Sequence, residues 1–155
     1  MRRAGLSLAG ALMIAAQPAL AQGDEGTVTG PVYTPSELPY PFSSAVQVEG
    51  VLYLSGDIGL AEDGSGPVPG GIEPETRRLF ERIGETLAAH GLTFDDVFKC
   101  TVMLADMAEW PAFNAIYAEY FTKGRYPVRS AMGVNGLALG ARVEMECWAW
   151  RLQGD

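Results

Sequence analysis

The sequence predicts an α+β domain in which two helices pack on one face of a single mixed sheet. Two observations predict this fold class. In five short segments apolar residues alternate with polar ones, the period of a half-buried strand, and in two longer segments they recur at helical spacing. The segments follow each other in the order β-β-α-β-α-β-β, and 155 residues give room for one such domain with one core.

Residues 1–21 precede the domain and have the layout of a secretory signal peptide. Paired arginines open a small, apolar run, and an Ala-x-Ala pattern ends at Ala21. The run is too short to span a bilayer comfortably, so we expect cleavage after Ala21 and a periplasmic or secreted protein without stable membrane association. Residues 22–38 are rich in Gly, Pro and acidic side chains and are expected to be a flexible lead-in to a domain over residues 39–155.

The first half of the domain is assigned from its period and its turn residues. Residues 45–56 alternate as two strands around a turn at Glu49 and Gly50. From residue 74 to 90 the apolar residues recur at helical spacing, with a proline in the first turn and a glycine after the end. Residues 95–106 then return to the alternation of a strand.

The second half predicts a surface that no helix covers. Residues 109–124 form the second helix with a buried aromatic stripe, and residues 129–134 and 141–150 are the last two strands. In the last strand one set of alternate residues is apolar, while the other mixes two carboxylates with two tryptophans. The apolar set should meet the helices. The mixed set is a poor surface to leave in water, so it predicts a subunit interface and therefore an oligomer.

The net charge and the few cysteines limit the classes of function that the chain can have. The chain carries 11 basic and 19 acidic side chains, and loss of the two arginines in residues 1–21 changes its net charge from −8 to −10. A charge of that sign repels phosphate backbones, so we expect no nucleic-acid partner. One histidine and two distant cysteines make no recognisable metal cluster, and we expect neither metal nor cofactor. Export permits a disulfide between Cys100 and Cys147, but two buried free thiols are the simpler interpretation of their mid-strand positions.

Two full charges lie in segments that are otherwise apolar, Arg129 at the head of one strand and Glu144 inside the next. A buried charge without a partner is costly, so each needs one. Either the two pair with each other or across two subunits, or Arg129 presents its guanidinium to a substrate carboxylate while Glu144 holds or activates a water. Partial burial should raise the pKa of Glu144 and a nearby Arg129 should lower it. Pattern alone does not choose between these interpretations.

Three segments carry a resemblance to a known family: PYPFSSAVQVEGVLYLSGDIG, FNAIYAEYF and YPVRSAMGVNGLALGARVEMECWAW. In order, from Pro39 to Leu152, they resemble the RidA/YjgF family of reactive-intermediate deaminases, and the Arg-Ser start and Glu-Met-Glu end are the specific part. The resemblance implies a chorismate-mutase-like fold assembled as a homotrimer, whose inner sheets form a barrel and whose ligand clefts lie between subunits. It also implies hydrolysis of 2-imino or 2-enamine acids to 2-keto acids and ammonia, without a cofactor.

The same resemblance implies roles for four residues. Arg129 matches the arginine that binds the substrate carboxylate, and Glu144 matches the glutamate that positions the attacking water. Ser55 and Asn114 match polar positions that line the cleft, and we expect the neighbouring subunit to supply them.

Two further cleft positions depart from the family's pattern. Ala131 stands where the best-studied deaminases have a cysteine, and Phe42 stands where they have a tyrosine. Neither side chain can donate a hydrogen bond, so the pocket is smaller beside Arg129 and more apolar opposite it. These departures keep a second function open, a trimeric module that binds small carboxylic or 2-keto acids without turning them over.

Overall fold

The computed structural model describes residues 30–150. The predicted signal peptide over residues 1–21 and its cleavage point lie outside the described residues. Within residues 30–150 no helix is long and apolar enough to cross a membrane.

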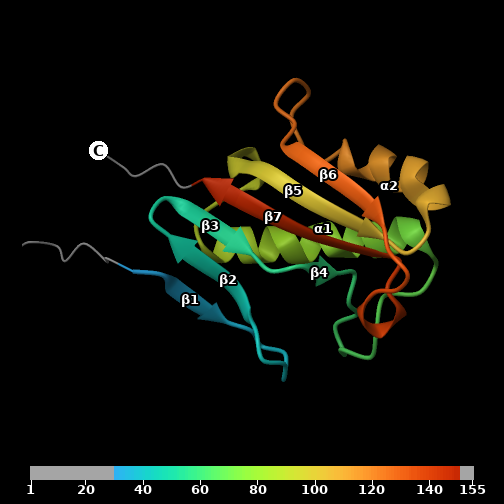
Figure 1. The fold of residues 1–155 in the computed structure, drawn as a ribbon, viewed down its shortest axis with the longest axis horizontal. Coiled ribbons are helices and arrows are strands. Elements are labelled where there is room, and N and C mark those ends of the chain that lie inside the picture. Colours follow the sequence, from blue (N-terminus) through green and yellow to red (C-terminus); the bar gives the residue numbers. More distant parts are fainter. Residues whose placement is uncertain (1–29, 151–155) are drawn as a thin grey trace, which may run out of the picture.

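Seven strands form one mixed sheet, and two α-helices pack on one of its faces (Figure 1). The strands are β1 (Val32–Pro35), β2 (Ser43–Val48), β3 (Val51–Leu54), β4 (Asp57–Ile58), β5 (Val97–Leu104), β6 (Val128–Gly133) and β7 (Val143–Trp150). They lie in the order β1-β2-β3-β7-β5-β6, with β4 also paired to β7, and the β5–β6 pair is parallel. The helices are α1 (Ile72–Ala89) and α2 (Trp110–Tyr117), with short 3-10 turns at Phe94–Asp96, Met107–Glu109 and Ala138–Gly140. The predicted fold class is confirmed.

The sheet begins earlier than the sequence predicts. Part of the expected lead-in forms β1, which pairs antiparallel with β2 and places Thr34 opposite Ala45. The Thr34 hydroxyl lies 2.8 Å from His90 Nε2, while His90 Nδ1 donates to the Thr86 carbonyl at the end of α1. Segment 32–35 is rich in residues that favour strands, and its proline is tolerated because β1 lies at the edge of the sheet. A flexible lead-in over these four residues was therefore wrong.

The two faces of β7 differ as predicted. Val143, Met145, Cys147 and Ala149 are fully buried against the helices. On the opposite face, which we call the open face, Glu146 and Trp148 are half-buried and Trp150 is 48% exposed. There Lys99 Nζ lies 4.1 Å from the centre of the Trp148 ring and 3.5 Å from Glu146. A subunit interface on this face stays a prediction.

Cys100 and Cys147 form a disulfide, so the prediction of two free thiols was wrong. The two residues lie directly opposite each other on β5 and β7, with 4.2 Å between their Cα atoms, and both are fully buried. The close pairs of an antiparallel ladder have this Cα spacing. The register of the two strands brings the thiols together, and sequence spacing alone does not contain that register.

Removing the disulfide should destabilise the domain strongly. We expect the double variant Cys100→Ala/Cys147→Ala to lose about 2–5 kcal/mol of unfolding free energy, because the bond closes a long loop in the unfolded chain. Urea unfolding of the oxidised wild type and of the variant measures the difference. The single variant Cys147→Ala is the matched control, since it removes the bond and leaves one thiol. An unchanged urea midpoint in the double variant would contradict a stabilising disulfide.

Candidate functional site

Arg129 lies on β6, the edge strand of the sheet beside α2. Its register partner on β5 is Cys100, which faces the helices, so the Arg129 side chain leaves the sheet on the helix-covered face. Its Nη2 donates to Asn114 Oδ1 at 2.7 Å. Asn114 was expected from a neighbouring subunit, but in this structure it contacts Arg129 of its own chain.

Helix α2 presents three side chains to Arg129. Trp110, Asn114 and Tyr117 stand at i, i+4 and i+7 and therefore share one stripe of the helix. Arg129 Cζ lies 4.6 Å from the centre of the Trp110 ring and 4.2 Å from the centre of the Tyr117 ring. Sequence reasoning placed Tyr117 in the core and gave Trp110 no role. The spacing of the two rings around Asn114 was the signal that could have identified them.

The guanidinium of Arg129 carries a positive charge that no acid within residues 30–150 neutralises. Among residues 30–150 no carboxylate lies within ion-pair distance of Arg129. Its Nη1 and the Tyr117 hydroxyl are buried and have no hydrogen-bond partner in this part of the chain. Burial raises the pKa of Tyr117 to about 12, and the charge of Arg129 opposes that rise. The phenol therefore stays neutral, and an incoming anion can neutralise Arg129.

Glu144 lies on the open face of β7, opposite Met103 of β5. Its carboxylate fills the space above Gly56, where an added Cβ would lie only 2.3 Å from Glu144 Oε1. Burial, and after it the negative charges of Asp57 and Glu146, raise the pKa of Glu144. Arg129 is not among the causes, so the expected lowering by Arg129 does not occur within one chain.

The backbone that carries Glu144 is held by a buried carboxylate on α1. Glu75 is 2% exposed, and its Oε1 accepts hydrogen bonds from the backbone N–H groups of Arg142 at 2.7 Å and Val143 at 3.3 Å. Burial raises the pKa of Glu75, while these two hydrogen bonds lower it. The start of β7 is thereby fixed to α1 one residue before Glu144.

The other predicted cleft residues are divided between the surroundings of Glu144 and those of Arg129. Ser55 adjoins Gly56 and so lies on the side of Glu144, where its hydroxyl donates to the Ser43 carbonyl at 2.6 Å. Phe42, next to Ser43 in the chain, is 42% exposed and stacks with Tyr40. Ala131 lies two residues after Arg129 on the same face of β6 and packs against the core. The predicted site is therefore split into an Arg129 group and a Glu144 group.

The two groups cannot meet around one small molecule within a single chain. Arg129 is level with Cys100 of β5 and Glu144 with Met103, and an odd separation along a strand puts the two side chains on opposite faces. The two positions lie three residues apart along the strands, which is about 10 Å, and two strand spacings apart across the sheet, which is again about 10 Å. Direct pairing of Arg129 with Glu144 in one chain, an alternative that the sequence left open, is therefore wrong.

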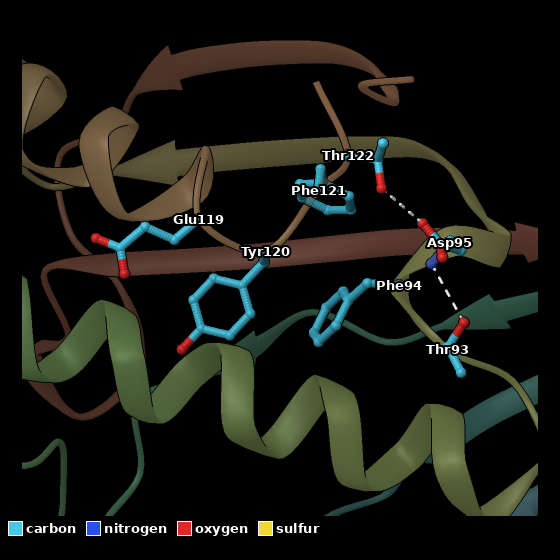
Figure 2. Close-up of a pocket in the computed structure, with 7 residues that line it drawn as sticks. All are labelled: Thr93, Phe94, Asp95, Glu119, Tyr120, Phe121 and Thr122. Carbon is cyan, nitrogen blue, oxygen red and sulfur yellow. Dashed lines mark hydrogen bonds between the residues drawn. The ribbon is translucent and has the colours of Figure 1, made fainter. Parts of the chain in front are cut away.

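Two hollows in the described part of the chain lie away from both groups. One cavity of about 320 Å³ is lined by Thr93, Phe94, Asp95, Glu119, Tyr120, Phe121 and Thr122. In Figure 2 the rings of Phe94 and Tyr120 are directed toward α1, and Thr122 is hydrogen-bonded to Asp95 at 3.2 Å. Tyr120 stacks on Phe80 with 4.0 Å between ring centres, so its ring packs in the core. Neither this hollow nor a second one beside Trp150 includes Arg129 or Glu144.

No group of three or more His, Cys, Asp or Glu side chains in residues 30–150 is arranged to hold a metal ion. The chemistry available at the two groups is that of an unpaired guanidinium and of a carboxylate whose pKa is raised. The first suits the binding of a carboxylate, and the second suits proton transfer to and from a water molecule.

Comparison with known proteins gives consistent matches. The family model described as "Endoribonuclease L-PSP" matches residues 35–151. A Mus musculus protein named 2-iminobutanoate/2-iminopropanoate deaminase is 43% identical over 109 residues, which is 70% of this chain and 80% of that protein. A Homo sapiens protein of the same name is 39% identical, over 70% of this chain and 79% of its own length.

Solved structures share the fold. YyfA from Yersinia pestis, described as a protein of unknown function of the conserved Rid protein family, gives a TM-score of 0.69 at 35% identity and covers 76% of this chain and 93% of its own. Yeast Mmf1 gives a TM-score of 0.68 at 32% identity, and the match covers 77% of this chain and 93% of Mmf1. Both similarities extend over most of the described domain.

Proposed function

This chain belongs to the RidA/YjgF family, and we propose that it is an exported deaminase that hydrolyses reactive 2-imino and 2-enamine acids to 2-keto acids and ammonia. The observation that carries the proposal is the guanidinium of Arg129, which has neutral partners in its own chain and so retains its charge for an anion. The relatives named 2-iminobutanoate/2-iminopropanoate deaminase support substrates of that type.

Arg129 binds the substrate carboxylate in this proposal. A guanidinium offers two parallel N–H donors that match the two oxygens of a carboxylate, which an ammonium cannot do. The carboxylate next to an imine carbon distinguishes a 2-imino acid from other imines. Binding it fixes the position of the reacting carbon relative to the rest of the site.

Glu144 positions and activates the water. Its raised pKa makes it a better base than an ordinary glutamate once it is ionised. It takes a proton from water as the water oxygen bonds to the imine carbon, and it passes that proton to the imine nitrogen, which becomes an amine. The proton of the new hydroxyl group is then transferred to the amine nitrogen, the carbon–nitrogen bond breaks with loss of ammonia, and a carbon–oxygen double bond forms. One water is consumed, nothing is oxidised or reduced, and the products are a 2-keto acid and ammonia.

A second copy of the chain completes the site. Because Arg129 and Glu144 lie on opposite faces of one sheet, a small substrate can touch both only when they come from different subunits. The open face, with its half-buried tryptophan and carboxylates, supplies the interface. A homotrimer, as the family resemblance implies, places one such site between each pair of subunits.

Three further residues line the proposed cleft. Ser55 and Phe42 border the Glu144 group, and Ala131 borders the Arg129 group. The Ser55 hydroxyl already donates to a backbone carbonyl, so it offers a substrate its lone pairs. Phe42 and Ala131 make the pocket more apolar, which favours 2-imino acids with short aliphatic side chains.

Two observations support export. Residues 1–21 have the pattern of a cleaved signal peptide. The buried disulfide between Cys100 and Cys147 suits an oxidising compartment and is unusual in the cytosol. The acidic charge of the chain opposes a nucleic-acid partner, whatever the description of the family model says.

A second function, binding without turnover, is favoured by one feature: the side chains of Ala131 and Phe42 cannot donate hydrogen bonds. Two measurements on purified residues 22–155 separate it from the deaminase. An amino-acid oxidase generates 2-iminobutanoate in place, semicarbazide traps what remains, and thermal unfolding is followed with and without 2-oxobutanoate. A deaminase accelerates imine decay. A binding module gains thermal stability from 2-oxobutanoate and leaves imine decay unchanged.

A further inference from the structure

We propose that Trp110 and Tyr117 are positioning residues, which hold the guanidinium of Arg129 in place for a carboxylate without neutralising it. The inference rests on the proposed function of Arg129 and adds two residues to it. We call Trp110, Asn114 and Tyr117 the clamp. All three come from one stripe of α2 and contact the same guanidinium.

An arginine in this place needs support. Its side chain has many rotamers, and it stands on the edge strand β6, where one neighbouring strand is missing. Ordering such a side chain when a ligand binds lowers the affinity, and a side chain that is already ordered avoids this loss. The clamp supplies that order: Cζ lies 4.6 Å and 4.2 Å from the two ring centres, and Asn114 accepts from Nη2 at 2.7 Å.

The chemistry of the clamp explains why it suits an anion site. Two carboxylates would also hold an arginine, but they would cancel its charge. Aromatic faces and an amide oxygen attract a cation and remain neutral. The buried Nη1 has no hydrogen-bond partner within residues 30–150. The faces of the Trp110 and Tyr117 rings therefore hold the Nη1 end of the guanidinium. The clamp therefore favours imines that carry a carboxylate over neutral imines.

The structure separates this role from ordinary core packing. Tyr117 also packs against Phe80 and Phe113 and is nearly fully buried, so its loss would disturb the core. Trp110 is half-buried at the start of α2, where a substitution changes the clamp with less effect on the core. Trp110 is therefore the position to change.

The test compares Trp110→Leu with Trp110→Phe, which keeps an aromatic face. A cation–π contact shifts an equilibrium by about 2–30-fold. We expect Trp110→Leu to weaken 2-oxobutanoate binding and to raise KM for 2-iminobutanoate by such a factor, with kcat nearly unchanged, since the contact serves binding. Trp110→Phe should restore most of the loss. In an Arg129→Ala background Trp110→Leu should cause no further loss, because it acts through Arg129.

Other results would overturn the clamp. A fall of kcat with unchanged KM, an equal loss in the Arg129→Ala background, or no rescue by Trp110→Phe would each contradict it. Where Trp110→Leu does not fold, Trp110→Met fills the space without a ring and takes its place. Calorimetric binding of 2-oxobutanoate needs no turnover. Wild type that binds it but leaves imines unchanged therefore overturns the deaminase alone, and wild type that neither binds it nor accelerates imine decay overturns both proposals.

Discussion

Arg129→Ala should lower kcat/KM for 2-iminobutanoate by at least about a hundredfold, because two charge-assisted hydrogen bonds to the carboxylate are lost. The same variant should lose its thermal protection by 2-oxobutanoate. The fold should survive, since Arg129 makes no ion pair within the described residues and its hydrogen bond goes to the exposed Asn114. Steady-state kinetics and a thermal scan measure both effects.

Arg129→Lys is the matched control for this prediction. It keeps the charge and removes the planar fork, so it should recover a small part of the activity if two parallel hydrogen bonds matter. Full activity of Arg129→Ala on 2-iminobutanoate would contradict carboxylate binding by Arg129. Full activity of Arg129→Lys would show that charge alone suffices.

Glu144→Gln should lower kcat by about a hundredfold or more, because an amide cannot accept the proton of the attacking water. It should also stabilise the fold at neutral pH. In the wild type the pKa of Glu144 is raised in the folded state, so the folded protein holds this proton more tightly than the unfolded chain does. Wild-type stability therefore falls as the pH rises from the unfolded pKa through the folded pKa, and the glutamine variant lacks this loss.

The same residue sets an expected pH dependence. Wild-type kcat should fall on acidification with a midpoint above the ordinary glutamate value of 4.5, because protonated Glu144 cannot act as a base. At saturating substrate the bound carboxylate neutralises the charge of Arg129. The pH midpoint of kcat therefore reports the raised pKa of Glu144. The residual activity of Glu144→Gln should not show this step. A wild-type profile without an acid limb, or one shared by Glu144→Gln, would contradict the assignment.

The fold followed from the sequence because most of its helices and strands have a local period in their apolar residues. The alternation in β7 gave both the buried face and the open face, and the helical spacing gave α1 and α2, although α2 ends at Tyr117 and not at residue 124. The errors came from long-range partners. Segment 32–35 forms a strand by pairing with β2, and Cys100 meets Cys147 only through the register of β5 with β7.

The candidate site was predicted as a set of residues and not as an arrangement. Motif matching identified Arg129 and Glu144, and the structure placed them on opposite faces of one sheet. Asn114 was expected from a neighbouring subunit and instead contacts Arg129 of its own chain, because the crossing of α2 over β6 cannot be read from spacing. Trp110 and Tyr117 were missed because an aromatic stripe on a helix is usually core, and only the position of Arg129 gives these rings a second role.

Complementation between two inactive variants tests the central claim most directly. Arg129→Ala and Glu144→Gln chains are mixed in equal amounts, unfolded together with the disulfide intact, refolded, and assayed for decay of 2-iminobutanoate. If one subunit supplies Arg129 and another Glu144, random assembly into a cyclic trimer restores about a quarter of the wild-type sites. Each variant refolded alone, and the two mixed without unfolding, are the controls. A mixture no more active than its separate components would contradict a site shared between copies of this chain.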